Sequence, residues 1–193
     1  SERYLREAVR LAERILADFS DAERGGFFTT AKNHEALLLR SREGPDGAIP
    51  SGNAVAASAL ARLSFHYGRD DFREAATLAI RAYGRQTARY PRAFAKSLAV
   101  VDLLLAGPVE LALVGTPGKP DYEALRAAVN RPYLPNRIIA QHDPSGPATT
   151  HPLLSGKTLV QGRAALYICR NFSCQAPITD PKTVATALAG PNK

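Results

Sequence analysis

The polar stretch between residues 43 and 53 holds the side chains best suited to acid–base chemistry. Glu43 and Asp46 are two carboxylates three positions apart, in a loop that precedes an apolar helical segment. Two carboxylates in one loop can act as general acid and general base. Asn53, or His34 from the preceding stretch, could bind a substrate hydroxyl. The sequence therefore predicts Glu43 and Asp46 as catalytic residues, and Asn53 and His34 as substrate-binding residues.

The same loop also has a structural interpretation. Asp46 lies in Gly44-Pro45-Asp46-Gly47, which is typical of a tight turn. Ser51 or Asn53 can cap the helix that follows. We favour the structural role for Asp46, whereas Glu43 has no alternative role beyond surface exposure.

The two cysteines form the second candidate group. Cys169 and Cys174 are separated by four residues, which matches neither a redox Cys-x-x-Cys nor half of a zinc ribbon. They could form a disulfide, a redox pair or, with His142 or His151, part of a metal site. Because Cys169 lies in an apolar strand, we expect a buried, inert thiol and no catalytic redox pair. We expect no metal and no cofactor, and a reducing, cytoplasmic compartment.

Composition limits the classes of partner. The 193 residues are 45% hydrophobic and 22% charged, as in a soluble globular protein. The net charge is +7, but arginines are spread along the chain and no run of five like charges occurs, so we expect no nucleic-acid partner. No apolar run approaches the ~20 residues that span a bilayer, so we expect no membrane contact. Since the chain has no methionine, we expect a piece processed or excised from a longer chain.

Four helical segments must position the candidate loop. Apolar residues at three- and four-residue spacing predict a first helix ending near Phe19 and an amphipathic helix over 71–89. A helix over 54–67 is apolar on nearly every face, which is typical of a buried helix. A fourth helix is predicted over 92–105. Short extended pieces are expected at 27–30 and 36–39.

The pattern changes at Gly107-Pro108. Beyond it the sequence predicts a helix capped by Asp121 and a last helix, together with three strands that share one sheet. The strands are 109–114, 136–141 and 165–169, and the helices are 121–129 and 181–189. A strand, helix and strand at this spacing indicate a parallel crossover.

Three stretches together resemble one family. They are Gly-Gly-Phe-Phe at 25–28, Asp-Gly-Ala-Ile-Pro-Ser-Gly-Asn-Ala-Val-Ala-Ala at 46–57, and 156–181 with Cys-Arg-Asn-Phe-Ser-Cys-Gln-Ala-Pro. In this order they resemble the C-terminal part of the thioredoxin-domain-containing, spermatogenesis-associated protein 20-like family. The resemblance covers essentially the whole chain.

The resemblance implies a fold and an origin. In that family a thioredoxin-like domain precedes an (α/α)6 six-hairpin barrel similar to those of glycosidases and N-acylglucosamine 2-epimerases. This chain has no Cys-x-x-Cys and too few helices for a barrel, so it looks like the end of such a protein, or a split or truncated relative. We expect a mainly α protein with a C-terminal α/β unit: partial (α/α)6-barrel-type hairpins over 1–106, then a small parallel or mixed sheet over 107–193. No catalytic residue is carried over from the family.

Two functions follow from this resemblance. The first is a fragment of a glycosidase- or epimerase-like protein that binds or processes carbohydrate when intact. The alternative is a non-catalytic scaffold or interaction domain, linked to redox chemistry through the thioredoxin domain. Because the apolar 54–67 helix needs cover, we also expect self-association or a partner chain that supplies the missing helices.

Overall fold

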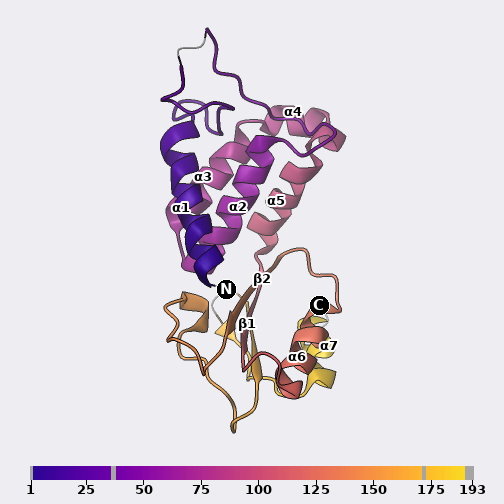
Figure 1. The fold of residues 1–193 in the computed structure, drawn as a ribbon. Helices are drawn as coiled ribbons and strands as arrows, with labels where there is room; N and C mark the ends of the chain where they lie inside the picture. Colours follow the sequence, from indigo (N-terminus) through magenta and orange to yellow (C-terminus); the bar gives the residue numbers. More distant parts are fainter. Residues whose placement is uncertain (1, 36–37, 171–172, 190–193) are drawn as a thin grey trace. The chain divides into compact units, whose positions relative to one another are not determined.

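The computed structural model describes residues 2–35, 38–170 and 173–189 (Figure 1). The chain divides between Ala106 and Gly107 into two compact units, which are described separately below. The first is helical and the second contains a sheet with helices. The expected fold class, mainly α with a C-terminal α/β unit, is therefore confirmed.

The first unit is built around one central helix. Its helices are α1 (Glu2–Phe19), α2 (Gly52–Tyr67), α3 (Asp70–Arg81), α4 (Gly84–Arg89), the 3-10 helix η1 (Pro91–Phe94) and α5 (Ala95–Ala106). α2 packs against α1, α3 and α5 (Figure 1). Leu60, Phe72 and Leu103 lie in the shared core. The sequence of α2 is apolar because three neighbours cover it.

Local chemistry sets the ends of α2. The Ser51 hydroxyl accepts a hydrogen bond from the Ala54 N–H at 3.2 Å, so the predicted capping role of Ser51 is confirmed. The helix ends at Gly68, whose φ of 66° is left-handed. Ala57 and Ala61 are completely buried, and their small side chains allow neighbouring helices to approach closely.

The predicted 71–89 helix is in fact two helices. α3 ends at Arg81 and α4 begins at Gly84. Between them Tyr83 leaves the helical conformation, with φ −113° and ψ 12°. The Tyr83 ring packs directly on Gly44, a contact that the helical pattern does not encode. The predicted 92–105 helix likewise begins as the 3-10 turn η1.

The extended pieces predicted near the candidate loop are mostly absent. In 27–30 the structure has a single bridge, between Ser20 and Phe27. Residues 36 and 37 lie outside the described part of the chain, and Leu38 and Leu39 belong to no strand. Isolated backbone hydrogen bonds, such as Thr29 N–H to the Ser41 carbonyl, and side-chain hydrogen bonds hold this region instead.

The second unit has a mixed four-stranded sheet. Its elements are β1 (Val109–Val114), α6 (Pro120–Asn130), β2 (Arg137–His142), the 3-10 helix η2 (Pro152–Leu154), β3 (Ala165–Arg170), β4 (Ser173–Cys174), the 3-10 helix η3 (Pro181–Thr183) and α7 (Val184–Ala189). The strand order is β2-β1-β3-β4. β1 and β2 are parallel, whereas β1–β3 and β3–β4 are antiparallel. The three predicted strands therefore share one sheet.

Alternating residues of β1 face two different layers. Leu111 and Leu113 pack with the buried residues of α6 and α7, while Ala112 and Val114 pack on the other face with Leu154 of η2. This alternation is the period of a strand covered on both faces.

Asp121 does not cap α6 as predicted. The residue before the helix is Lys119, which makes no side-chain capping bond. Asp121 Oδ2 instead accepts a hydrogen bond from the Ala164 N–H at 2.8 Å, which ties α6 to the start of β3. A partner 43 positions away replaces the local one.

The two cysteines form a disulfide. Cys169 and Cys174 lie directly opposite each other on β3 and β4, with their sulfur atoms 2.14 Å apart. The expectation of a free, inert thiol at Cys169 is therefore wrong, although its side chain is buried as expected. The short strand β4, which pairs Cys174 with Cys169, was not among the predicted strands.

Candidate functional site

A pocket of about 800 Å³ lies in the first unit. One wall is the stretch 42–52, here named the pocket loop, and the other is formed by α4 and η1. Its lining includes Arg42, Glu43, Asp46, Tyr83, Tyr90 and Phe94. A volume of this order suits a small organic ligand, and such sites combine an apolar lining with a few polar groups.

Asp46 lines this pocket, but backbone groups occupy its carboxylate. One oxygen accepts from the Ser51 N–H at 2.9 Å and the other from the Lys96 N–H at 2.9 Å. The Asp46 N–H donates to the Ala93 carbonyl at 2.7 Å. Lys96 lies in the first turn of α5, so Asp46 caps that helix from a distance and fastens the pocket loop to it.

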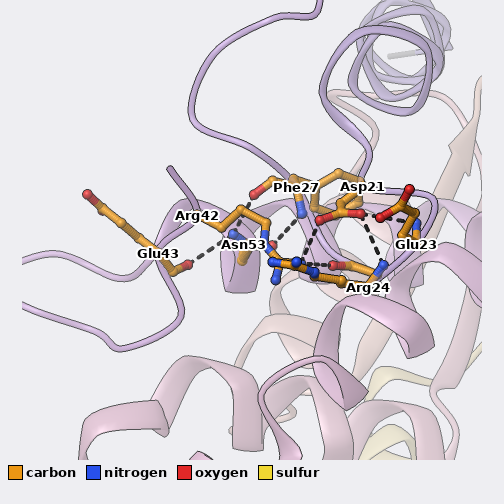
Figure 2. Close-up of polar contacts among 8 residues, drawn as sticks. Asp21, Glu23, Arg24, Phe27, Arg42, Glu43 and Asn53 are labelled. Carbon is orange, nitrogen blue, oxygen red and sulfur yellow. Dashed lines mark hydrogen bonds and ion pairs between the residues drawn. The ribbon is translucent and has the colours of Figure 1, made fainter. Parts of the chain in front are cut away.

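Asn53, at the start of α2, holds the pocket loop through its side-chain amide. Its side chain is only 5% exposed, and its Oδ1 accepts from the Phe27 N–H at 2.7 Å. Its Nδ2 donates to the carbonyls of Phe27 and Glu43, both at 2.9 Å (Figure 2). Both donors of the amide are therefore committed to backbone atoms, and Asn53 positions Glu43.

Glu43 is the free carboxylate of the pocket. Its backbone carbonyl is fixed by Asn53, while its exposed side chain extends away from Asn53 and Arg42 (Figure 2). Within the described part of the chain, its carboxylate has no hydrogen-bond or ion-pair partner. Such a group is available to a ligand.

His34 lies apart from these residues. It is exposed in the loop that follows α1, its N–H donates to the Ala31 carbonyl at 3.2 Å, and it does not line the pocket. The structure thus brings Glu43 and Asp46 to one pocket. Asn53 holds the backbone of Glu43 without lining this pocket, and His34 lies outside it.

An ion pair supports the pocket from the α1–α2 connection. Arg42 Nη1 lies 3.1 Å from Asp21 Oδ2 and donates to the Gly25 carbonyl at 2.6 Å (Figure 2). Both side chains are largely buried. Burial acts to raise the pKa of the Asp21 carboxyl, but the N–H groups of Arg24 and Glu23 and the charge of Arg42 outweigh it and hold the pKa below its ordinary value. The charge of Asp21 is therefore stabilised.

Tyr83 lines the same pocket as Arg42. Its hydroxyl is buried and has no hydrogen-bond partner among residues 2–35, 38–170 and 173–189. Burial raises the pKa of Tyr83, while the positive charge of Arg42 opposes the rise. A buried hydroxyl without a partner is costly, and a ligand or a water could satisfy it.

Sequence reasoning missed Arg42, Asp21 and Tyr83. The turn residues from Asp21 to Gly26 were the one local signal near the ion pair, and they do not identify its partner. The site as a whole offers one unpaired carboxylate and aromatic surface. The described residues contain no group of three or more His, Cys, Asp and Glu side chains that could hold a metal ion. No described helix is long and apolar enough to cross a membrane.

Comparison with known proteins finds relatives of this chain. No family model matches the sequence. Spermatogenesis-associated protein 20 of Mus musculus and of Rattus norvegicus are each 32% identical to the chain over 182 residues, and that of Homo sapiens is 31% identical. Each match covers 92% of this chain, but the chain spans only 23% of the length of these relatives. The predicted resemblance to the spermatogenesis-associated protein 20-like family is confirmed: nearly the whole chain matches one part of these much longer relatives.

Proposed function

We propose that the pocket described above binds carbohydrate in the intact protein. One observation carries the proposal: the about 800 Å³ pocket combines the rings of Tyr83 and Tyr90 with the unpaired carboxylate of Glu43. Aromatic rings provide apolar surface for the C–H faces of a sugar ring. A carboxylate accepts hydrogen bonds from hydroxyl groups.

The proposal includes the organisation of the whole protein. We place the 1–106 helices within an (α/α)6 glycosidase- or epimerase-like barrel that follows a thioredoxin domain. The proposed location is the cytoplasm, although the disulfide between Cys169 and Cys174 is of a kind that reducing compartments rarely hold. The greater length of the relatives leaves room for both. The α/β unit over 107–193 follows the barrel.

Glu43 is the residue proposed to take part in chemistry. Acid–base reactions at a glycosidic bond usually require two carboxyl groups. Asp46 is bound to two backbone N–H groups and serves the loop, so a second catalytic group must come from another part of the intact protein. The chain alone is expected to bind sugar without turning it over.

Calorimetric titration of this chain with neutral mono- and disaccharides tests the binding, and turnover is tested in a full-length relative. Glu43→Gln is expected to abolish turnover and leave the melting temperature unchanged, since its side chain makes no contact that stabilises the fold. Asp46→Asn is expected mainly to lower the melting temperature, because one N–H loses its acceptor. Glu74→Gln, at an exposed position of α3, is the control. Sugar binding or turnover that is the same in Glu43→Gln as in the unchanged protein would contradict the proposal.

A scaffold or interaction role is the second candidate, and α5 favours it. This helix is mostly apolar, and Leu98 and Leu105 on it are 40% and 84% exposed. Such a face suits a second copy, or a partner chain that adds helices. Light scattering after size exclusion distinguishes the two roles: a monomer that binds sugar supports the first, and an oligomer disrupted by Leu98→Ser and Leu105→Ser supports the second.

A further inference from the structure

We propose that the carbohydrate bound in this pocket is anionic, and that Arg89 and Arg92 hold its negatively charged group. This inference rests on the proposed carbohydrate site and names the class of sugar. The shared chemistry is a carboxylate or phosphate ester attached to a sugar ring.

The charge pattern of the second pocket wall is one-sided. Between Glu74 and Asp102 the chain contains no acidic residue. The same interval carries the basic residues Arg81, Arg85, Arg89, Arg92 and Lys96. It forms the end of α3, all of α4 and η1, and the start of α5, so the basic residues lie on or next to the elements of the pocket wall, beside the lining residues and not among them.

Arg85, Arg89 and Arg92 lack the carboxylate partner that several other arginines have. Arg10, Arg14 and Arg126 pair with Glu7, Asp18 and Glu123 on their own helices. Arg85, Arg89 and Arg92 are exposed, and no ion pair joins them to any described residue. Their charge is therefore available to a ligand.

Two of these arginines lie next to pocket-lining residues. The Arg89 guanidinium lies 5.2 Å from the centre of the Tyr90 ring, and Tyr90 lines the pocket. Arg92 lies in η1 between Tyr90 and Ala93, which also lines it. A sugar against Tyr90 would place a substituent near the Arg89 guanidinium, and Arg92 follows two positions after Tyr90 on the same wall.

The acids around the pocket do not cancel this charge. Asp21 is paired with Arg42, and Asp46 accepts from two backbone N–H groups. Glu43 alone remains free, on the opposite, loop side. Guanidinium groups bind carboxylate and phosphate through paired hydrogen bonds, so the α4–η1 side selects an anion while Glu43 can accept from hydroxyls.

The test compares glucose, glucuronate, glucose 6-phosphate and inorganic phosphate by calorimetric titration of the full chain. We expect at least one anionic sugar to bind about tenfold tighter than glucose, with the advantage reduced by salt. The double variant Arg89→Gln/Arg92→Gln should lose that advantage and keep glucose binding. Arg10→Gln/Arg14→Gln, which removes the same charge from α1, is the matched control and should bind like the unchanged chain. Melting temperatures establish that both variants fold.

The outcomes distinguish the anionic-sugar inference from the carbohydrate site on which it rests. The tighter of glucuronate and glucose 6-phosphate identifies the source of the anion. Equal binding of glucose and both anionic sugars overturns the inference and leaves the carbohydrate site intact, whereas no binding of any sugar overturns both. Inorganic phosphate binding as tightly as the sugar phosphate also overturns it, as does a single-stranded RNA that binds through the same arginines while sugars do not.

Discussion

Replacing Asn53 by alanine tests whether this amide holds the pocket loop. The change removes three hydrogen bonds and leaves the Phe27 N–H and the carbonyls of Phe27 and Glu43 without their partner. An orphaned buried polar group costs about 1–3 kcal/mol. Two of these groups are buried and the third is reached more easily by water, so we expect a loss of about 3–5 kcal/mol. Natural domains have only about 5–15 kcal/mol to lose.

Asn53→Asp adds a pH dependence to the same test. The introduced carboxyl keeps an acceptor for the Phe27 N–H but faces two carbonyl oxygens in a buried place. Burial and the nearby carbonyl oxygens both disfavour the charged carboxylate, so they raise the pKa of the introduced carboxyl in the folded state above the unfolded value of about 3.9. A raised folded pKa gives stability that is present below the unfolded pKa and lost as pH rises through the folded one. This variant should therefore be least stable near pH 7 and recover towards pH 4.

Urea unfolding measures the loss of stability, and hydrogen exchange followed by mass spectrometry localises it. The local measurement matters because a chain of two units need not unfold in one step. Exchange should accelerate over residues 26–44 and stay unchanged in the sheet unit. Asn33→Ala and Asn33→Asp make the same changes at an exposed loop position and serve as controls. A loss below about 1 kcal/mol for Asn53→Ala, with unchanged exchange over 26–44, would refute this role.

Two further predictions concern packing and a distant hydrogen bond. Gly44→Ala places a methyl group against the ring of Tyr83, closer than two carbon atoms can approach, and should cost about 1–3 kcal/mol in thermal or urea unfolding. Gly47→Ala, with no atom within 4 Å of the added methyl group, should be neutral. Equal effects of the two variants would contradict the ring contact. Asp121→Ala should cost about 1–2 kcal/mol near pH 7. Because the Ala164 N–H holds the pKa of Asp121 below its ordinary value, the Asp121 contribution is lost as pH falls through the folded pKa. The difference between Asp121→Ala and the unchanged chain should therefore shrink below about pH 4, and a constant difference would contradict this bond.

Local patterns predicted the helices and the strands well. The first helix ends at Phe19 as expected, Ser51 caps α2, and the apolar stretches that begin at 109, 136 and 165 form strands of one sheet. These features depend on neighbours within a few positions, which the sequence displays directly.

The features that sequence reasoning missed depend on distant partners. The α3–α4 break occurs at Tyr83, whose ring packs on Gly44 from the pocket loop. Asp121 contacts Ala164 instead of capping α6. Every residue except proline carries the same backbone N–H and carbonyl groups, so nothing in the sequence marks which of them will bond to a distant side chain.

Only the local part of the candidate site was predicted, because the rest depends on distant partners. Glu43 and Asp46 lie in one loop and line one pocket, as their short separation suggested. The partners of Asn53 at Phe27, and of Asp46 at Lys96, appear only once the chain has folded. His34 was grouped with them on residue type alone, and its exposed loop position keeps it away from the pocket lining.

Asn53 and Asp46 grip the pocket loop entirely through main-chain atoms, at Phe27, Glu43, Ser51 and Lys96. The shape of the loop is therefore independent of the side chain carried at position 43. Evolution, or an engineer, can exchange that side chain for an acid, an amide or an apolar group and present each from the same backbone position. The backbone of the loop fixes the position of residue 43 and leaves its side chain open to substitution. Related chains can therefore differ in the chemistry of their pocket while keeping its architecture.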